Sequence, residues 1–329
     1  MASKRVQNPV VCPGHSRPIV EVNFSTETPD GLFLVSASKD GCPMLRNGDS
    51  GDWIGTFEGH KGAVWSAVLN TPALLAATGS ADFTARVWDA VSGDEKAQFQ
   101  HKHIVRSVQF ARKRDLLATG GAEKIIRLFD LGRPEESEEF DPTIDNVQHL
   151  AFCQDDKSIL ASYATEKGIS VFDARTKKVV KTLETPNQVT SIEVAADGSL
   201  FTTTDGNFVR FWNSATLEQI KEFEMEVNIG AASLNLHFGK FVVGGEDMSV
   251  RLYDFNSGEE LENNRKHHGP VHTVQFAPSG RTYASGSEDG TIRLWDTWLG
   301  EMVSDGNGNV SKEDPKEGIT AQSVEAIAA

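Results

Sequence analysis

Four polar or aromatic residues recur at identical offsets in two stretches of the chain that lie 207 residues apart. In each stretch a His is followed by Ser or Thr after 18 residues, by Asp after 22 and by Trp after 28. The two sets are His60, Thr78, Asp82, Trp88 and His267, Ser285, Asp289, Trp295. Four matching residues at matching offsets require an internal repeat, so the chain is built from copies of one structural unit.

The copy nearest the end of the chain shows what one unit contains. Residues 271–276, 281–287 and 291–295 are short runs in which apolar and polar residues alternate, and turns rich in Pro, Ser, Gly and Asp separate them. Alternation with a period of two, broken by tight turns, predicts antiparallel strands joined by hairpins. The stretch from His60 to Asp89 has the same pattern.

The residue that ends each sequence unit gives the period of the repeat. These residues are Arg46, Trp88, Phe129, Phe172, Trp212, Tyr253 and Trp295, spaced 40 to 43 residues apart, with Arg46 placed by register alone. A period of about 40–45 residues with four strands per unit is typical of WD40 propeller blades. The sequence therefore predicts an all-β, seven-bladed WD40 β-propeller over residues 1–300.

The units differ in how well they keep the four-residue set. The third unit keeps it in altered form, as His101, Thr119, Glu123 and Phe129. Units four to six are worn, since Ile144 and Thr185 stand where a His is expected and the sixth unit has no His near Met225. In the fifth unit Asp205 comes one residue early, which predicts an extra residue in the loop before 209–212.

The two ends of the chain have different predicted roles. Val6–Cys12 aligns with the strand that precedes His60, yet no earlier blade exists to hold it. Because an open edge strand invites unwanted pairing, we expect this segment to close the ring as the outer strand of the last blade. Glu301–Val303 is a second candidate for that position. Residues 301–329 are acidic and poor in large apolar groups, which predicts a disordered tail.

Composition narrows the class of protein. With 32 basic and 47 acidic residues the net charge is −15, which disfavours direct binding of nucleic acid. Three widely spaced cysteines suggest free thiols and no zinc knuckle. Signal-peptide, membrane-spanning, nucleotide-binding and metal-binding patterns are lacking, so we expect a soluble intracellular protein without cofactor, metal site or membrane contact.

The repeated His, Thr and Asp have the residue types of a hydrolase triad. Their recurrence in at least two blades favours a structural role, because an enzyme has no use for two triads on one ring. In such a blade the Asp accepts a hydrogen bond from the His, the His meets the hydroxyl, and the hydroxyl meets the indole N–H. Buried polar groups are paired in this way. The protein is therefore expected to have no catalytic residues and not to be an enzyme.

The remaining candidate for function is the rim of the central channel. The residue after the first apolar position of each inner strand, and the residue before the turn Asp, are expected to face this rim. The partner-binding candidates are Val20, Lys39, Trp65, Arg106, Gln148, Thr190, Glu246, His272 and Glu288. Trp65 and Arg106 are the strongest, since Trp and Arg are common interface anchors. The alternative for Trp65 is packing inside the blade, and Trp298 is a second exposed aromatic candidate.

Five stretches carry a closer resemblance. They are Asp40–Asn70, Ala81–Glu95, His101–Phe110, Tyr253–Leu261 and Ser285–Trp295. Together they resemble the serine/threonine kinase receptor-associated protein family, also called the unr-interacting proteins. The most specific feature is the Pro43-Met44-Leu45-Arg46 ending of the first unit, which departs from the general repeat.

The resemblance implies a non-catalytic adaptor that is cytoplasmic and nuclear and works as a monomer within a larger complex. The partners it implies are survival-of-motor-neuron complex components in spliceosomal ribonucleoprotein assembly, a cold-shock-domain RNA-binding protein, and receptor kinases of the TGF-beta type. The alternative is the i subunit of translation initiation factor three, whose members share segments similar to GHKGAVW. An enzyme that uses the channel is a third, less favoured, possibility.

Overall fold

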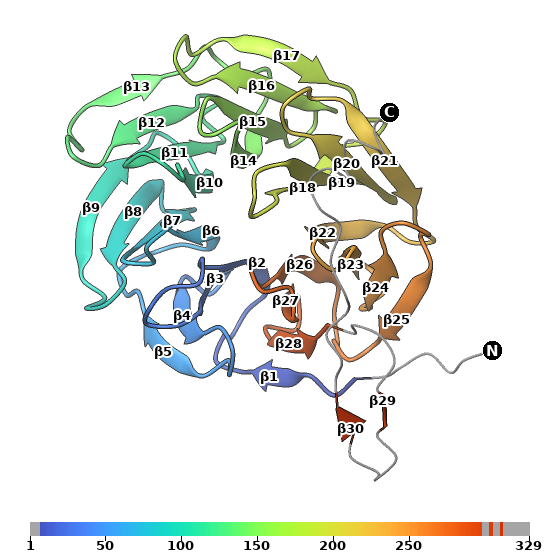
Figure 1. Ribbon diagram of the computed structural model, residues 1–329. Helices are drawn as coiled ribbons and strands as arrows, with labels where there is room; N and C mark the ends of the chain where they lie inside the picture. Colours follow the sequence, from blue (N-terminus) through green and yellow to red (C-terminus); the bar gives the residue numbers. More distant parts are fainter. Residues whose placement is uncertain (1–6, 298–302, 305–309, 312–329) are drawn as a thin grey trace.

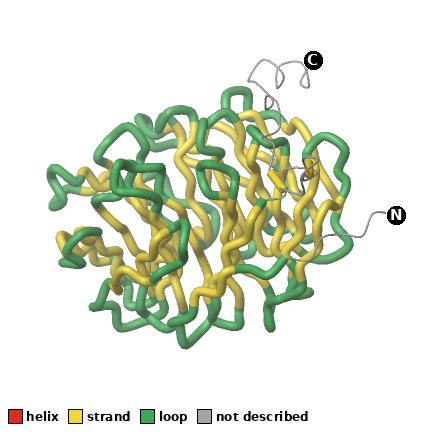
Figure 2. Tube along the Cα trace, turned by 60° about the horizontal axis from the view of Figure 1, so that its bottom comes forward, coloured by secondary structure: helices red, strands yellow, loops and turns green. Residues whose placement is uncertain are grey.

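The computed structural model describes residues 7–297, 303–304 and 310–311. Seven sheets of four antiparallel strands stand as blades around a central channel (Figure 1). An oblique view shows strands filling the body of the ring and loops covering its two faces (Figure 2). The all-β, seven-bladed propeller predicted from the sequence is confirmed. Within the described residues no helix is long and apolar enough to cross a membrane.

Each blade runs from an inner strand at the channel to an outer strand at the circumference. The inner strands are β2 (Ile19–Phe24), β6 (Val64–Leu69), β10 (Val105–Phe110), β14 (Val147–Cys153), β18 (Val189–Val194), β22 (Ile229–Asn235) and β26 (Val271–Phe276). The second strands are β3 (Phe33–Ser38), β7 (Leu75–Ser80), β11 (Leu116–Gly121), β15 (Ser158–Tyr163), β19 (Leu200–Asp205), β23 (Lys240–Gly245) and β27 (Thr282–Ser287). We number the blades one to seven in this order.

The third strands carry the aromatic markers of the sequence repeat. They are β4 (Met44–Asn47), β8 (Thr84–Asp89), β12 (Arg127–Asp130), β16 (Ile169–Asp173), β20 (Phe208–Asn213), β24 (Val250–Asp254) and β28 (Ile292–Asp296). The outer strands are β5 (Trp53–Thr56), β9 (Glu95–Gln100), β13 (Ser137–Glu139), β17 (Val179–Leu183), β21 (Gln219–Glu224), β25 (Glu260–Asn264) and, for blade seven, β1 (Val10–Cys12). The sequence unit therefore ends one strand before the blade does.

The core lies between neighbouring blades. Buried apolar residues form seven clusters, and each cluster joins the facing sides of two successive blades. The cluster between blades two and three, for example, packs Val87 and Phe99 against Val108 and Phe129. Second strands are covered on both sides, so their burial is nearly continuous, whereas inner strands are only partly buried where they line the channel and most outer strands are largely exposed.

The N-terminal strand closes the ring. Strand β1 pairs antiparallel with β28, with Val10 opposite Leu294 and Cys12 opposite Ile292. Cys12 is buried in the cluster between blades seven and one. Just before β1, the Gln7 backbone N–H donates to the Asn264 side-chain oxygen of β25 at 3.0 Å, so the segment also reaches blade six. The prediction that this segment completes the last blade is confirmed, although the strand begins at Val10 rather than Val6.

The rival closing strand does not occupy that position. Val303 belongs to β29 (Val303–Ser304), which pairs with β30 (Val310–Ser311) rather than with blade seven. These two short strands lie within the stretch expected to be disordered. The rest of residues 301–329, and Trp298, lie outside the described residues. The three cysteines, all of them described, are unpaired.

The prediction of an extra residue in the fifth unit is wrong. The Trp212 indole N–H donates to Thr203, which lies nine residues earlier in the chain. In blade two the equivalent hydrogen bond, from Trp88 to Thr78, spans ten residues. The hairpin in blade five is therefore one residue shorter, because Asp205 still pairs in the ladder with Phe208 across a two-residue turn. Asp205 occupies the strand position of Ser80 rather than the turn position of Asp82.

Candidate partner-binding site

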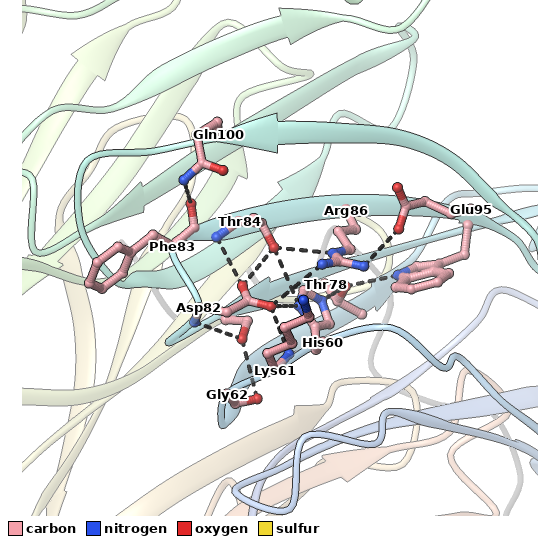
Figure 3. A network of polar contacts seen from close by, with 12 residues as sticks. His60, Lys61, Gly62, Thr78, Asp82, Phe83, Thr84, Arg86, Glu95 and Gln100 are labelled. Carbon is pink, nitrogen blue, oxygen red and sulfur yellow. Dashed lines mark hydrogen bonds and ion pairs between the residues drawn. The ribbon is translucent and has the colours of Figure 1, made fainter.

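The histidine network of blade two joins a loop, a hairpin turn and two strands (Figure 3). His60 lies in the loop before β6, and its Nδ1 is 2.8 Å from Asp82 Oδ2. Its Nε2 is 2.7 Å from Thr78 Oγ1, which also accepts a hydrogen bond of 2.8 Å from the Trp88 indole N–H. The His60 side chain has no exposed surface. The network ties the rim loop to the second and third strands.

Blade seven repeats this arrangement. His267 Nδ1 lies 3.0 Å from Asp289 Oδ2, and His267 Nε2 lies 2.8 Å from Ser285 Oγ. The Trp295 indole N–H donates to the same Ser285 oxygen at 2.8 Å. The carboxylate fixes the proton on Nδ1, so Nε2 is left to accept from the hydroxyl. Both ring nitrogens of His267 are hydrogen-bonded and the ring is enclosed, which fits a structural role.

Blade three keeps the His and loses the indole donor. His101 Nδ1 is 3.3 Å from Glu123, and Thr119 Oγ1 is 3.3 Å from His101 Nε2. Phe129 cannot donate and instead meets the His101 ring edge-on. Arg127 adds a hydrogen bond of 2.9 Å to Glu123, so a guanidinium replaces part of the missing network.

Blade one contains a histidine network that the sequence reasoning missed. His15 Nδ1 lies 2.8 Å from Asp40 Oδ2, and its Nε2 lies 2.8 Å from Ser36 Oγ. Arg46 stands where the Trp would be and donates to the Gly51 carbonyl at 3.1 Å. The four-residue spacing of Ser36 and Asp40 equals that of Thr78 and Asp82, and it was the available signal.

The electrostatics of these networks follow from burial and hydrogen bonding. Burial alone would raise the pKa of Asp40, but hydrogen bonds from His15 and from backbone N–H groups lower it to about 2. Burial lowers the pKa of His101 and of His267 to about 4. The imidazoles of His101 and His267 are enclosed, with almost no side-chain exposure, which leaves them no open path to a substrate.

A β-bulge at the start of every inner strand sets the direction of the rim side chains. In each blade the pairing between inner and second strand shifts register between the first and third residues of the inner strand. The residue passed over in each shift is unpaired, and bulges redirect such side chains. These residues are Val20, Trp65, Arg106, Gln148, Thr190, Gly230 and His272.

Six of the nine candidates form one continuous arc over five blades. His272 Nε2 lies 2.6 Å from Glu288 Oε2, and Lys39 Nζ lies 3.7 Å from the same oxygen. Lys39 Nζ is 5.9 Å from the centre of the Trp65 ring. On that ring lies the Arg106 guanidinium at 3.8 Å, and Arg106 Nε donates to Gln148 Oε1 at 3.0 Å. We call these six residues, from His272 to Gln148, the rim arc.

The other three candidates lie outside the rim arc. Val20 packs against the core cluster between blades one and two. Thr190 Oγ1 lies 2.7 Å from Thr204 Oγ1 and donates to the Ile229 carbonyl at 3.0 Å, in blades five and six. Glu246 accepts a hydrogen bond of 3.1 Å from the Asn228 side chain of blade six.

Trp65 does not pack inside the blade. Its side chain is half-buried, and it belongs to none of the seven core clusters formed by the described residues. The cover over its ring is the Arg106 guanidinium. Its indole N–H is buried and meets no hydrogen-bond acceptor within the described part of the chain. A large aromatic ring is thus held at the rim by a cation rather than by core packing.

The channel interior contains two ionisable groups that were not among the candidates predicted from the sequence. A cavity of about 470 Å³ is lined by the inner strands, and Glu21 and Glu193 both face it. Burial raises the pKa of Glu21 to about 7 and that of Glu193 to about 8. Among the described residues no group of three or more His, Cys, Asp or Glu side chains could hold a metal ion. A charged residue inside an apolar-alternating inner strand was the sequence signal for both.

Arg112 restricts the cavity at the end away from the rim arc. It follows β10 in blade three, and its guanidinium donates to the carbonyls of Val194, Ala195 and Ala196 in blade five at 2.9 to 3.0 Å. These bonds pass over blade four.

Comparison with known proteins decides the family. The repeat model "WD domain, G-beta repeat" matches residues 51–89, 93–130, 177–213 and 259–296. The serine-threonine kinase receptor-associated protein of Gallus gallus is 47% identical over 96% of this chain and 90% of its own length. The chain belongs to the serine-threonine kinase receptor-associated protein family.

Further relatives support this assignment. The Homo sapiens member of the serine-threonine kinase receptor-associated protein family is 46% identical over 98% of this chain and 94% of its own length. The Dictyostelium discoideum member is 42% identical over 88% of this chain and 99% of its own length. The alternative considered from the sequence is more distant, since Homo sapiens eukaryotic translation initiation factor 3 subunit I is 27% identical over 87% of this chain.

Proposed function

We propose that this protein is a non-catalytic WD40 adaptor whose protein partner docks on the rim arc. The observation that carries the proposal is the contact chain from His272 to Gln148, centred on Trp65 and Arg106. A half-buried Trp under an Arg, surrounded by polar groups, is the composition of an interface anchor. The bulges present these side chains without disturbing the ladders that hold the blades.

The finer function follows the family. Its members are named for association with receptor serine-threonine kinases, and a receptor-kinase signalling complex is one proposed setting. The second is survival-of-motor-neuron-linked assembly of spliceosomal ribonucleoproteins, with a cold-shock-domain RNA-binding protein as a further partner. In each setting the protein would act as a monomer within a larger complex in the cytoplasm and nucleus, without binding nucleic acid directly. A role as an initiation factor subunit is the alternative.

The test is affinity capture of the tagged protein from cytosolic lysate beside a Trp65→Ala/Arg106→Ala variant. The matched control is Trp53→Ala/Arg133→Ala, which removes an exposed Trp and an exposed Arg from the outer circumference of blades one and three. We expect wild type and control to recover receptor kinases or survival-of-motor-neuron components and the rim variant to lose them while remaining folded.

Three outcomes would change the proposal. Equal recovery by the rim variant would show that the rim arc is not the docking surface. Loss in the control alone would place the interface on the circumference. Recovery of initiation factor subunits instead of the proposed partners would favour the alternative function.

A further inference from the structure

The rim arc has its most unusual chemistry where blades two and three meet. Trp65 and Arg106 come from the inner strands β6 and β10 of these blades. Phe83 lies in the hairpin turn of blade two, and His103 lies in the loop that leads into β10, three residues before Arg106. The Phe83 and His103 rings are 5.3 Å apart. We call Trp65, Phe83, His103 and Arg106 the seam surface.

Phe83 is held in a backbone conformation that does not suit it. It follows the turn carboxylate Asp82 and has a φ of 71°. The residues after the corresponding carboxylates of blades one and seven are Gly41 and Gly290, with φ of 85° and 76°. A bulky residue in this left-handed region is less stable than in its preferred conformations. Lys124 and Met248 have the same backbone conformation in blades three and six, with φ of 59° and 68°, so what distinguishes Phe83 is an exposed aromatic ring on this turn.

Phe83 gains no core packing in return for this strain. Its side chain is 39% exposed, and its only ring contact within the described residues is with the exposed His103. Its carbonyl accepts a hydrogen bond of 2.8 Å from the His101 backbone N–H, so the turn is tied to the start of blade three. Phe83 and His103 therefore offer a fixed apolar contact surface to solvent.

Arg106 is oriented as a receptor for a carboxylate. Stacking on Trp65 fixes the plane of its guanidinium, and the bond from Nε to Gln148 fixes its rotation. Its two terminal nitrogens make no hydrogen bond or ion pair within the described part of the chain. A planar guanidinium with both terminal nitrogens available matches the two oxygens of a carboxylate.

The surrounding charges favour an acidic ligand despite the net charge of −15. The turn carboxylates of blades two and three face inward, where Asp82 bonds His60 and Glu123 bonds Arg127. The exposed Lys61 and Lys102 lie in the two rim loops and make no ion pair with any described residue. Three cations, Arg106, Lys61 and Lys102, thus stand beside one exposed carboxylate of the blade-two rim loop, Glu58, for which no ion pair is found among the described residues.

We propose that the seam surface binds a short acidic peptide segment of a partner, with an Asp or Glu carboxylate on Arg106 and a large apolar side chain against Phe83 and His103. This inference rests on the rim arc as the docking surface and adds the chemical class of the ligand. Trp65 serves as the platform that holds Arg106 flat.

The test selects peptides from a random twelve-residue display library on the immobilised full-length protein. An enriched peptide is then synthesised with a fluorescent label and titrated by fluorescence anisotropy. We expect enriched sequences to combine Asp or Glu with a large apolar residue a few positions away. Asp→Asn in the peptide should weaken binding to wild type about tenfold and binding to Arg106→Gln far less, because both changes remove the same charged contact. Added salt should also weaken binding.

Phe83→Gly separates binding from folding. It should weaken binding several-fold without lowering the melting temperature, an outcome that a purely structural Phe83 would not produce. Enrichment of basic or uncharged peptides that still require Trp65 would overturn the acidic class and leave the rim arc as the docking surface. Peptides that bind Trp65→Ala and Arg106→Gln as well as wild type, or no enrichment at all, would count against both.

Discussion

Blades one, two, three and seven bind their rim loops through histidine, whereas blades five and six lack this histidine and pair the aspartate at the end of the second strand or in the turn with arginine. In blade five Arg210 Nε donates to Asp205 Oδ1 at 2.7 Å, and neither side chain is appreciably exposed. In blade six Asp247 accepts 3.2 Å and 3.0 Å bonds from Arg251 and Arg265. Both the histidine networks and the arginine–aspartate pairs give buried polar groups hydrogen-bond partners. Blades five and six therefore depart from the repeat sequence by using other polar residues, and their buried polar groups remain paired.

The two regions also differ in how their third strands pack. Blade seven places Trp295 over its histidine network, whereas blades five and six build a cluster of aromatic rings. Phe211 meets Phe241 and Phe255 at 5.4 and 4.9 Å, and Phe241 stacks on Tyr253 at 5.0 Å. The histidine networks are therefore confined to blades one, two, three and seven, and the largest aromatic cluster lies between blades five and six, although smaller ring pairs such as Phe99 and Phe129 occur elsewhere. The rim arc lies mainly over the histidine half.

The largest expected effect is that of Trp295→Ala, which should lower the free energy of unfolding by about 3–5 kcal/mol. The side chain is 1% exposed, and its loss also leaves Ser285 without a donor. Trp212→Ala in blade five should cost less by about 1 kcal/mol, because Thr203 has no histidine network to disturb. The measurement is thermal and chemical unfolding of both variants. An unchanged melting temperature for Trp295→Ala would contradict the structural role.

Asp205→Asn tests the arginine–aspartate pair and should cost about 3 kcal/mol, because the buried Arg210 would keep only the exposed Glu222 as a carboxylate partner. Asp82→Asn in blade two should cost only about 1–2 kcal/mol, since the amide oxygen can still accept from His60 and the Lys61 backbone N–H, and Arg86 keeps Glu95 as a partner. The double variant Asp205→Asn/Arg210→Met should recover part of the loss. Equal costs at the two aspartates would remove the energetic distinction between the two halves.

The histidine half should be the acid-sensitive one. His101 and His267 have folded-state pKa values of about 4, against about 6.5 in an unfolded chain. Between these values only the unfolded chain takes up the protons, so the free energy of unfolding falls as the pH drops from about 6.5 to 4. Glu193 acts in the opposite direction. Its pKa of about 8 means that its contribution is complete below about 4.5 and lost as the pH rises through 8.

Melting temperatures between pH 4 and 9 check both signs. His267→Gln should show a smaller loss between pH 6.5 and 4 than wild type, and Glu193→Gln a smaller loss between pH 4.5 and 8. Direct titration of the His267 ring by NMR is the independent measurement. A His267 resonance that titrates near 6.5 would contradict the enclosed, neutral imidazole described here.

The sequence predicted what depends on periodicity and missed what depends on loop length or on contacts between blades. The blade period, the networks of His60 and His267 and the closing strand all follow from constant offsets. The network of His15 escaped because blade one has extra residues between β2 and β3, where Thr28 and Gly31 form an isolated bridge. The Arg–carboxylate pairs had a signal, an Arg two residues before the aromatic marker in five units, including Arg210 and Arg251.

At the rim, too, the sequence predicted positions but not contacts between blades. Position within a strand predicted which residues border the channel, because every inner strand carries the bulge. It could not predict that Arg106 covers Trp65 or that Lys39 and His272 share Glu288, since these contacts join neighbouring blades. Val20 has an equivalent position and packs against a core cluster while it also lines the channel cavity. Side-chain size decides between these outcomes only once the blades are in place.

The smallest expected effect tests the comparison within the histidine half itself. Phe83→Gly should raise the free energy of unfolding by about 0.5–1 kcal/mol, because relief of the left-handed backbone outweighs the added freedom of the unfolded chain. The reciprocal change Gly290→Ala in blade seven should destabilise, since a Cβ there would lie 3.3 Å from the His15 and Arg17 carbonyls. Urea unfolding resolves both signs. If Phe83→Gly instead destabilised the protein, the Phe83 ring would be shown to support the fold, and its exposure would no longer argue for a ligand.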